Sequence, residues 1–108
     1  MKSAAIVICV TTPTRALARR IVSSLIKKRL IACGNVLSGV SSFFIWKGKA
    51  AAARETLILM KTRKGHFRRV AAEVRRLHSY EVPEIVALPI VDGTEEYLRW
   101  IDSSVTGR

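Results

Sequence analysis

Four segments of the chain are rich in apolar, β-branched or aromatic residues and short enough to be β-strands: residues 4–12, 36–46, 56–60 and 84–91. The first is apolar at almost every position, which predicts a strand buried on both faces. In the second, Ser38-Gly39 indicates a bulge or bend. A turn at residues 47–49 joins the second and third strands, and the alanines at 50–53 are compatible with a helical turn, a strand or a loop. Pro89 has no N–H to donate, so the fourth strand should lie at an edge or a bulge.

Three other segments carry apolar side chains at three- and four-residue spacing, as amphipathic helices do: residues 13–30, residues 65–78 and a short stretch after residue 94. Thr12 as N-cap and Pro13 as first helical residue predict the start of the first helix, and the Cys-Gly-Asn sequence at 33–35 predicts its end. Pro83 prevents the second helix from continuing. Thr94 is the predicted N-cap of the last helix.

The predicted order of elements is βαββαβ with a trailing helix, which is typical of a ferredoxin-like sandwich. This is an α+β fold in which two helices cover one face of an antiparallel sheet. At 108 residues the chain fits one such domain, residues 1–108. Two of the strands are apolar on both faces, whereas the two main helices can cover only one face and the last helix is too short to cover the other. We therefore expect copies of the chain to pack sheet against sheet in a close homo-oligomer.

The composition is that of a folded globular protein. Hydrophobic residues make up 49% and charged residues 25% of the chain, which excludes a disordered or fibrous class. The longest apolar runs, residues 4–10 and 85–91, are far shorter than the roughly 20 residues of a membrane span. Two cysteines, Cys9 and Cys33, cannot make a disulfide framework in a chain of this length, so we expect a reducing, cytoplasmic location.

The charge of the chain is high and unevenly distributed. Lys and Arg number 19 against 8 Asp and Glu, a formal charge of +11, and residues 1–80 hold 17 of the basic residues but 2 of the acidic ones. On both main helices the basic side chains fall opposite the apolar stripe: Arg15, Arg19, Arg20, Lys27, Arg68, Arg69, Arg75 and Arg76. One alternative function is therefore binding of a polyanion such as nucleic acid. Because no base-reading motif accompanies these residues, we do not expect specific nucleic-acid binding, and a solvated basic surface is the default interpretation.

Several motifs resemble those of the CutA divalent-cation tolerance proteins. The most specific is His-Ser-Tyr-Glu-Val-Pro-Glu-Ile at residues 78–85, followed by Ala-Leu-Pro-Ile at 87–90 and Tyr-Leu-Arg-Trp-Ile at 97–101. Supporting matches lie at residues 29–36, 46–49 and 61–63, in the family's order and at its spacing. The resemblance covers nearly the whole chain.

The resemblance implies a stable homotrimer of ferredoxin-like subunits, similar in architecture to the PII signalling proteins, with the sheets facing inward. It also implies a role in tolerance of copper and other divalent cations. In a PII-like trimer a ligand cleft between subunits would be edged by Asn35, Trp46, Lys61, Tyr80 and Glu84. Lys61 would favour a small anion there or pair with Glu84. A further alternative is a PII-like sensor of a small molecule without a metal role.

The best candidates for metal ligands are Cys33 and His78, which would hold Cu²⁺ or another divalent cation, because both lie in family-matching segments at helix ends. Such a site would need further donors from a neighbouring subunit. The chain departs from the family pattern at Lys47 and at residues 50–53, where acidic residues are usual, and at Ser79, where proline is usual. These departures weaken the case for a metal site in the loop after Trp46.

Catalysis is not expected from this sequence. His78, Tyr80 and Glu81 lie close enough together for acid-base chemistry, but no nucleophile or oxyanion arrangement accompanies them. A structural role is favoured instead, with His78 at the end of the second helix, where a cation meets the negative end of the dipole, and with the other two residues fastening the turn.

Overall fold

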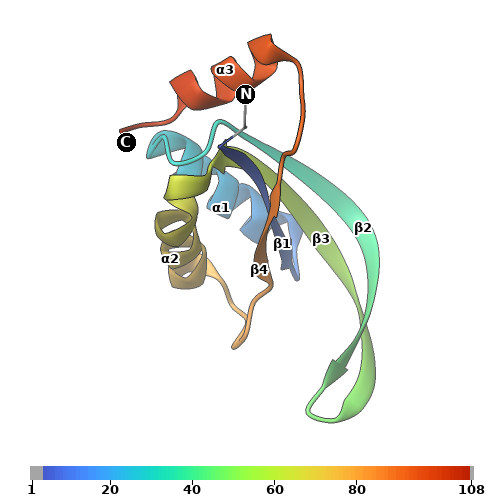
Figure 1. Ribbon diagram of the computed structural model, residues 1–108. Coiled ribbons are helices and arrows are strands. Elements are labelled where there is room, and N and C mark those ends of the chain that lie inside the picture. The colour runs from blue at the N-terminus through green and yellow to red at the C-terminus, as the bar shows by residue number, and fades with distance from the viewer. Residues whose placement is uncertain (1–3, 108) are drawn as a thin grey trace.

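Four antiparallel strands form one sheet in the order β2-β3-β1-β4 (Figure 1). In this computed structural model, which describes residues 4–107, the elements are β1 (Ala5–Thr12), α1 (Arg15–Lys27), β2 (Cys33–Trp46), β3 (Lys49–Arg63), the 3₁₀ turn η1 (Lys64–His66), α2 (Phe67–Leu77), β4 (Ile85–Pro89) and α3 (Glu95–Ser104). The crossover through α1 leaves a gap between β1 and β2 that β3 fills, antiparallel to both. The predicted ferredoxin-like fold is confirmed.

Helices α1 and α2 lie on one face of the sheet with their apolar stripes turned toward it (Figure 1). Alternate residues of the two central strands are fully buried beneath them: Ile8, Val10, Ile58 and Met60. The fully buried helix residues are Ala18, Ile21, Leu25, Val70 and Val74. The period of two in the strands and of 3.6 in the helices thus brings both apolar sets into one layer. The intervening strand residues face the other way.

The first helix begins two residues later than predicted. Its N-cap is Thr14, whose hydroxyl accepts a hydrogen bond from the N–H of Leu17 at 3.1 Å. Thr12 is instead the last residue of β1, paired with Thr56 of β3, and its own hydroxyl donates to the carbonyl of Thr14 at 2.8 Å. The prediction for Thr12 was wrong because strand pairing holds this residue in the sheet.

The first helix also ends earlier than predicted, at Lys27. Arg29 adopts a positive φ of 55°, and the N–H of Leu30 turns back to the carbonyl of Leu25. The Cys-Gly-Asn sequence at 33–35 is therefore the beginning of β2 and not the helix stop. The residue that adopts the left-handed conformation at the helix end is Arg29 and not a glycine. Gly34, the predicted marker of the helix end, lies further along the chain in β2.

Strands β2 and β3 form a long hairpin. Lys47 and Gly48, with φ of 52° and 79°, make a two-residue turn whose backbone twist matches that of the strands. The pairing register shifts between Leu37 and Val40, which confirms the bulge predicted at Ser38-Gly39. Residues 50–53, for which the sequence left three conformations open, lie in β3.

The end of this hairpin extends beyond the rest of the sheet (Figure 1). Strand β1 pairs with β3 only as far as Thr56, so residues 49–55 have β2 as their only strand partner. We call residues 40–55 the hairpin arm. Seven residues of strand span about 24 Å at 3.4 Å per residue, so the arm accounts for much of the 44 Å long axis of the protomer.

Helix α3 lies across the end of the sheet where β2 begins and leaves the second sheet face uncovered (Figure 1). The segment after α3 is tied down by Arg63, whose guanidinium donates to the carbonyls of Val105 at 3.2 Å and Thr106 at 3.4 Å, and by His66, whose Nε2 donates to Thr106 at 2.7 Å.

Strand β4 is an edge strand, as Pro89 predicted. Within residues 4–107, no helix has the length and apolar character needed to cross a membrane.

Candidate ligand-binding site

The sheet face that the helices do not cover, here called the open face, is mostly apolar. Strand register places eleven residues on it: Val7, Cys9 and Thr11 of β1; Cys33, Asn35 and Leu37 of β2; Leu57, Leu59 and Lys61 of β3; Val86 and Leu88 of β4. On this face Leu88 is 54% exposed to solvent and Val86 is 48% exposed. The open face is therefore a large apolar surface that the described chain does not shield.

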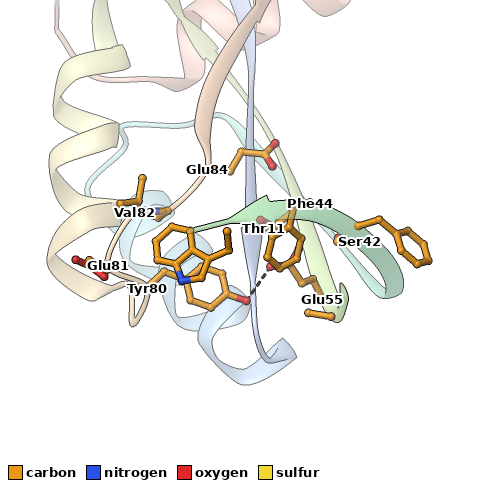
Figure 2. A pocket seen from close by; sticks show the side chains of 12 residues that line it. Thr11, Ser42, Phe44, Glu55, Tyr80, Glu81, Val82 and Glu84 are labelled. Carbon is orange, nitrogen blue, oxygen red and sulfur yellow. Dashed lines mark hydrogen bonds between the residues drawn. The ribbon is translucent and has the colours of Figure 1, made fainter. Parts of the chain in front are cut away.

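A cleft of about 740 Å³ lies where the end of the open face near Thr11 meets the hairpin arm (Figure 2). Twelve residues line it: Thr11, Ser42, Phe43, Phe44, Trp46, Ala53, Glu55, Tyr80, Glu81, Val82, Pro83 and Glu84. The arm contributes the aromatic wall, β1 and β3 contribute the floor, and the segment between α2 and β4 closes the side. Its size is within the range of small-molecule sites.

Tyr80 and Glu55 form the best-defined polar contact of the cleft. The Tyr80 hydroxyl donates to Oε2 of Glu55 at 2.7 Å, and the Glu55 side chain is buried (Figure 2). Burial, followed by the hydrogen bond to the carboxylate, raises the pKa of Tyr80 to about 12. Tyr80 is thus fixed as a neutral donor, and Glu55 supplies a negative charge at the floor of the cleft.

His78 holds the segment that carries Tyr80 against β1. The N–H of Tyr80 donates to Nδ1 of His78 at 3.1 Å, so the ring hydrogen lies on Nε2, which donates to the carbonyl of Thr11 at 2.8 Å. His78 is at the C-cap position of α2, but its ring bonds to β1 and to its own turn and not to the helix carbonyls. The predicted helix-dipole contact is replaced by a strand contact, because β1 ends beside this turn.

The cleft is acidic in a protein that is otherwise basic. Among residues 4–107 its lining contains three of the eight acidic residues of the chain, Glu55, Glu81 and Glu84, and no Lys, Arg or His. Carboxylates beside the faces of aromatic rings favour a positively charged ligand. The charge of the cleft lining in the protomer is therefore negative, whereas Lys61 would give a positive charge to a site for a small anion.

The residues predicted to edge one cleft fall into two groups on each protomer. Trp46, Tyr80 and Glu84 line the cleft described above. Asn35 and Lys61 lie at the other end of the open face, where the Lys61 ammonium donates to Oδ1 of Asn35. Within the protomer Lys61 therefore pairs with Asn35, and its pairing with Glu84 in a cleft between subunits stays a prediction. A site containing all five residues would require a second copy of the chain.

The two candidate metal ligands are also separated. Cys33 lies in the row of Lys61 and Val7, whereas His78 contacts Thr11, four residues further along β1, or about 13 Å at 3.3 Å per residue. Both ring nitrogens of His78 already have hydrogen-bond partners. Among residues 4–107 no three His, Cys, Asp or Glu side chains converge as a metal site would need. The donors of one protomer therefore do not fit a metal centre.

Sequence reasoning missed Glu55 and the apolar residues of the arm that line the cleft. Glu55 alternates along β3 with the same spacing of two as Leu57, Leu59 and Lys61, which indicates that its side chain lies on their face of the sheet. Its burial depends on Tyr80, which lies 25 residues away in the sequence. The hydroxyl contact between them could not be read from spacing.

Comparison with known proteins gives the class to which this fold and cleft belong. A family model described as "CutA1 divalent ion tolerance protein" matches residues 6–104. The chain belongs to this family, and the resemblance of its motifs is confirmed.

The relatives named "Divalent-cation tolerance protein CutA" include proteins from Thermus thermophilus and Archaeoglobus fulgidus. The one from Thermus thermophilus is 42% identical over 88% of this chain and 92% of the relative, and the one from Archaeoglobus fulgidus is 44% identical over 91% and 95%. A solved structure of the Thermus thermophilus protein superposes with a TM-score of 0.92 at 39% identity, covering 94% of this chain and 99% of the other. The chain spans about half the length of the plant relatives that it matches.

Proposed function

We propose that this chain serves divalent-cation tolerance as a cytoplasmic homotrimer in which the open faces pack together. The observation that carries the proposal is the apolar open face, which the strand register continues along the arm through Phe44 and Trp46, each 42% exposed. On the other face of the arm, Phe43 and Ile45 remain 81% and 71% exposed. A two-stranded ribbon is marginally stable alone in water, and β4 offers an unpaired edge. Three copies arranged around an axis would cover the face, the arm and the edge together.

Assembly would also bring together groups that one protomer keeps apart. Cys33, Asn35 and Lys61 lie at one end of the open face, and Trp46, Tyr80 and Glu84 lie at the other. Packing of neighbouring copies can place one end beside the other. We infer that a divalent cation such as Cu²⁺ draws ligands from more than one copy, with Cys33 supplying a soft donor and His78 exchanging a hydrogen bond for the metal.

The oligomeric state is tested by sedimentation of the chain and of two variants. Leu88→Arg places a charge on the exposed part of the open face, whereas Ile26→Arg places the same charge on α1, where Ile26 is 43% exposed. We expect three-chain particles for the parent and for Ile26→Arg, and single chains for Leu88→Arg. A parent that sediments as a single chain would contradict the proposal.

The metal role is tested by calorimetric titration of the assembled protein with Cu²⁺ and Zn²⁺. Cys33→Ala and His78→Ala should each weaken binding by at least about tenfold. Cys9→Ala is the control, because burial, followed by the charge of Glu84, raises the pKa of the Cys9 thiol and disfavours the thiolate that a metal needs. Equal affinities for all three variants would dismiss Cys33 and His78 as ligands.

The acidic cleft favours a second candidate function, which is sensing of a small organic cation without a metal role. Glu55, Glu81 and Glu84 would attract the ligand, and the ring of Trp46 would pack against it. Thermal-shift titration with an aliphatic diamine and with a dicarboxylate of the same length tests this choice. The diamine should stabilise the parent but not a Trp46→Ala variant, and stabilisation by the dicarboxylate would contradict it.

A further inference from the structure

The positive charge of the chain is concentrated on the two helices that cover the sheet. Residues 15–29 and 64–77 contain eleven Lys and Arg and one Glu, a formal charge of +10, while the whole chain carries +11. All eleven are exposed: Arg15, Arg19, Arg20, Lys27, Lys28, Arg29, Lys64, Arg68, Arg69, Arg75 and Arg76. Because α1 and α2 pack together on the same sheet face (Figure 1), these exposed residues belong to one side of the molecule, here called the basic helical face.

Little of this charge is neutralised by the chain itself. The single acid, Glu73, is buried and is shared by Lys28 at 3.1 Å and Arg76 at 2.8 Å. Within residues 4–107, every ion pair of the two segments ends on Glu73. The remaining basic side chains repel one another, and an isolated protomer gains nothing from placing them together. A polyanion would relieve this repulsion.

We propose that the basic helical face binds the phosphate backbone of double-stranded nucleic acid without reading its sequence. Helix α1 has 13 residues and so extends about 20 Å at 1.5 Å per residue. A duplex carries one phosphate charge per 1.7 Å of axis with both strands counted, so a stretch of this length carries on the order of ten phosphates, of which one side of the duplex presents a part. Eight of the eleven basic residues are Arg, whose planar guanidinium matches phosphate oxygens in two-point hydrogen bonds.

A lipid surface fits this face less well than a duplex does. Helices that bind membranes bury their apolar stripe among the lipid chains. Here that stripe is already used, because Ile21, Leu25, Val70 and Val74 are fully buried against the sheet. Only charge is left to attract a bilayer, whereas a duplex also offers regularly spaced acceptors to the guanidinium groups. The basic helical face lies on the side of the sheet away from the open face, so binding there is independent of assembly.

The test uses fluorescence anisotropy of a labelled DNA duplex of mixed sequence, titrated with the full chain between about 50 and 200 mM salt. One variant carries Arg19→Gln, Arg20→Gln, Arg68→Gln and Arg75→Gln, which avoids the partners of Glu73. The control carries Lys47→Gln, Lys49→Gln, Arg54→Gln and Arg99→Gln, with the same net charge but changes outside the basic helical face. Glutamine maintains helix propensity, and circular dichroism verifies that both variants fold.

We expect the parent to bind with a dissociation constant in the range of about 10⁻⁶ to 10⁻⁴ M, typical of binding without sequence preference. The helical variant should bind more than about tenfold more weakly, with a slope of log affinity against log salt reduced by about 3 to 4. The control should stay within about twofold of the parent.

Three outcomes would overturn the proposal. The first is an equal loss of affinity in both variants, which would mean that net charge acts without a defined surface. The second is the absence of duplex binding at the lowest salt concentration. The third is binding to vesicles of phosphatidylserine and phosphatidylcholine that excess duplex does not displace, which would assign the face to a membrane.

Discussion

The two faces of the same sheet differ in whether the rest of the chain covers them. On β3, Ile58 is 0% exposed under the helices, while its neighbours Leu57 and Leu59 face outward and stay half-buried. All three side chains are of similar size and hydrophobicity. The difference lies in where the helices pack: α1 and α2 cover one face, whereas α3, which at 10 residues is nearly as long as the 11-residue α2, lies across the end of the sheet and leaves the other face open (Figure 1). A face that is apolar but uncovered indicates a partner outside the protomer.

Substitution of neighbouring residues on β3 should give the largest contrast between the two faces. Ile58→Ala removes methyl groups from a packed core and should lower the free energy of unfolding by about 2–5 kcal/mol at any protein concentration. Leu59→Ala should act through assembly, so its effect should depend on protein concentration. Guanidinium denaturation at low and at high protein concentration measures both. If Leu59→Ala lowered the free energy of unfolding equally at low and at high protein concentration, this result would contradict the distinction between the two faces.

The helix-covered side also holds a buried carboxylate, which should give the next largest effect. The hydrogen bond from Arg76, followed by that from Ser24, keeps the pKa of Glu73 well below its usual range. Glu73→Gln should cost about 2 kcal/mol near neutral pH. The matched control is Glu95→Gln, since Glu95 pairs with Arg99 on an exposed helix surface and should cost less than about 1 kcal/mol.

The pH dependence gives a second measurement on Glu73. A carboxyl whose pKa is lower in the folded than in the unfolded state stabilises the fold above its unfolded pKa, and this contribution is lost as the pH falls. The parent should therefore lose stability on acidification below about pH 4.5, and Glu73→Gln should lose less. Parallel acid profiles for the two proteins would show that the Glu73 cluster does not join α1 to α2 in solution.

At the border between the two sides, Tyr80→Phe should have a smaller effect. It leaves the buried Glu55 without its donor and should cost about 1–2 kcal/mol. Because the pKa of Tyr80 is raised to about 12, its contribution is complete below the ordinary tyrosine pKa and is lost as the pH rises toward 12. Absorbance titration of the phenols should show one late step in the parent that disappears in the variant. A late step that persists would assign it to Tyr97.

The smallest effect is expected at the end of the molecule, where His66 is buried under the segment after α3. Burial lowers the pKa of its imidazole, and the charges of Arg69 and Arg63 lower it further. A group of this kind stabilises the fold above its unfolded pKa, and this contribution is lost as the pH falls below about 6.5, because protonation places a charge in a buried site beside Arg69 and Arg63. Hydrogen exchange in α3 should rise with acidification in the parent and rise less in His66→Gln. Unchanged exchange in the parent would contradict this.

Much of the fold could be predicted from the sequence because its signals are local and repeated. The period of two in the strands, the period of 3.6 in the helices, Pro89 at an edge and the bulge at Ser38-Gly39 are all properties of a few neighbouring residues. The errors occurred where a distant partner decided a local choice. Thr12 satisfied the rule for an N-cap but was retained by pairing with Thr56 of β3.

The candidate site could be predicted only in part for the same reason. Trp46, Tyr80 and Glu84 line one cleft of the protomer, whereas Lys61 lies beside Asn35 at the far end of the open face. The cleft between subunits that the PII-like architecture implies for these residues stays a prediction about the assembled protein. Glu55, which sets the negative charge of its floor, is identified by its contact with Tyr80 and not by any motif.

Composition and spacing are enough to specify which side chains are apolar, how often they recur, how much charge the chain carries and on which side of the two main helices that charge lies. Strand pairing and packing were needed to bring the carboxylates of Glu55, Glu81 and Glu84 together in one cleft. The physical reason is that strand order and register are fixed by pairing between residues far apart in the chain. One such arrangement turns alternate side chains under the helices and leaves the others facing away from them.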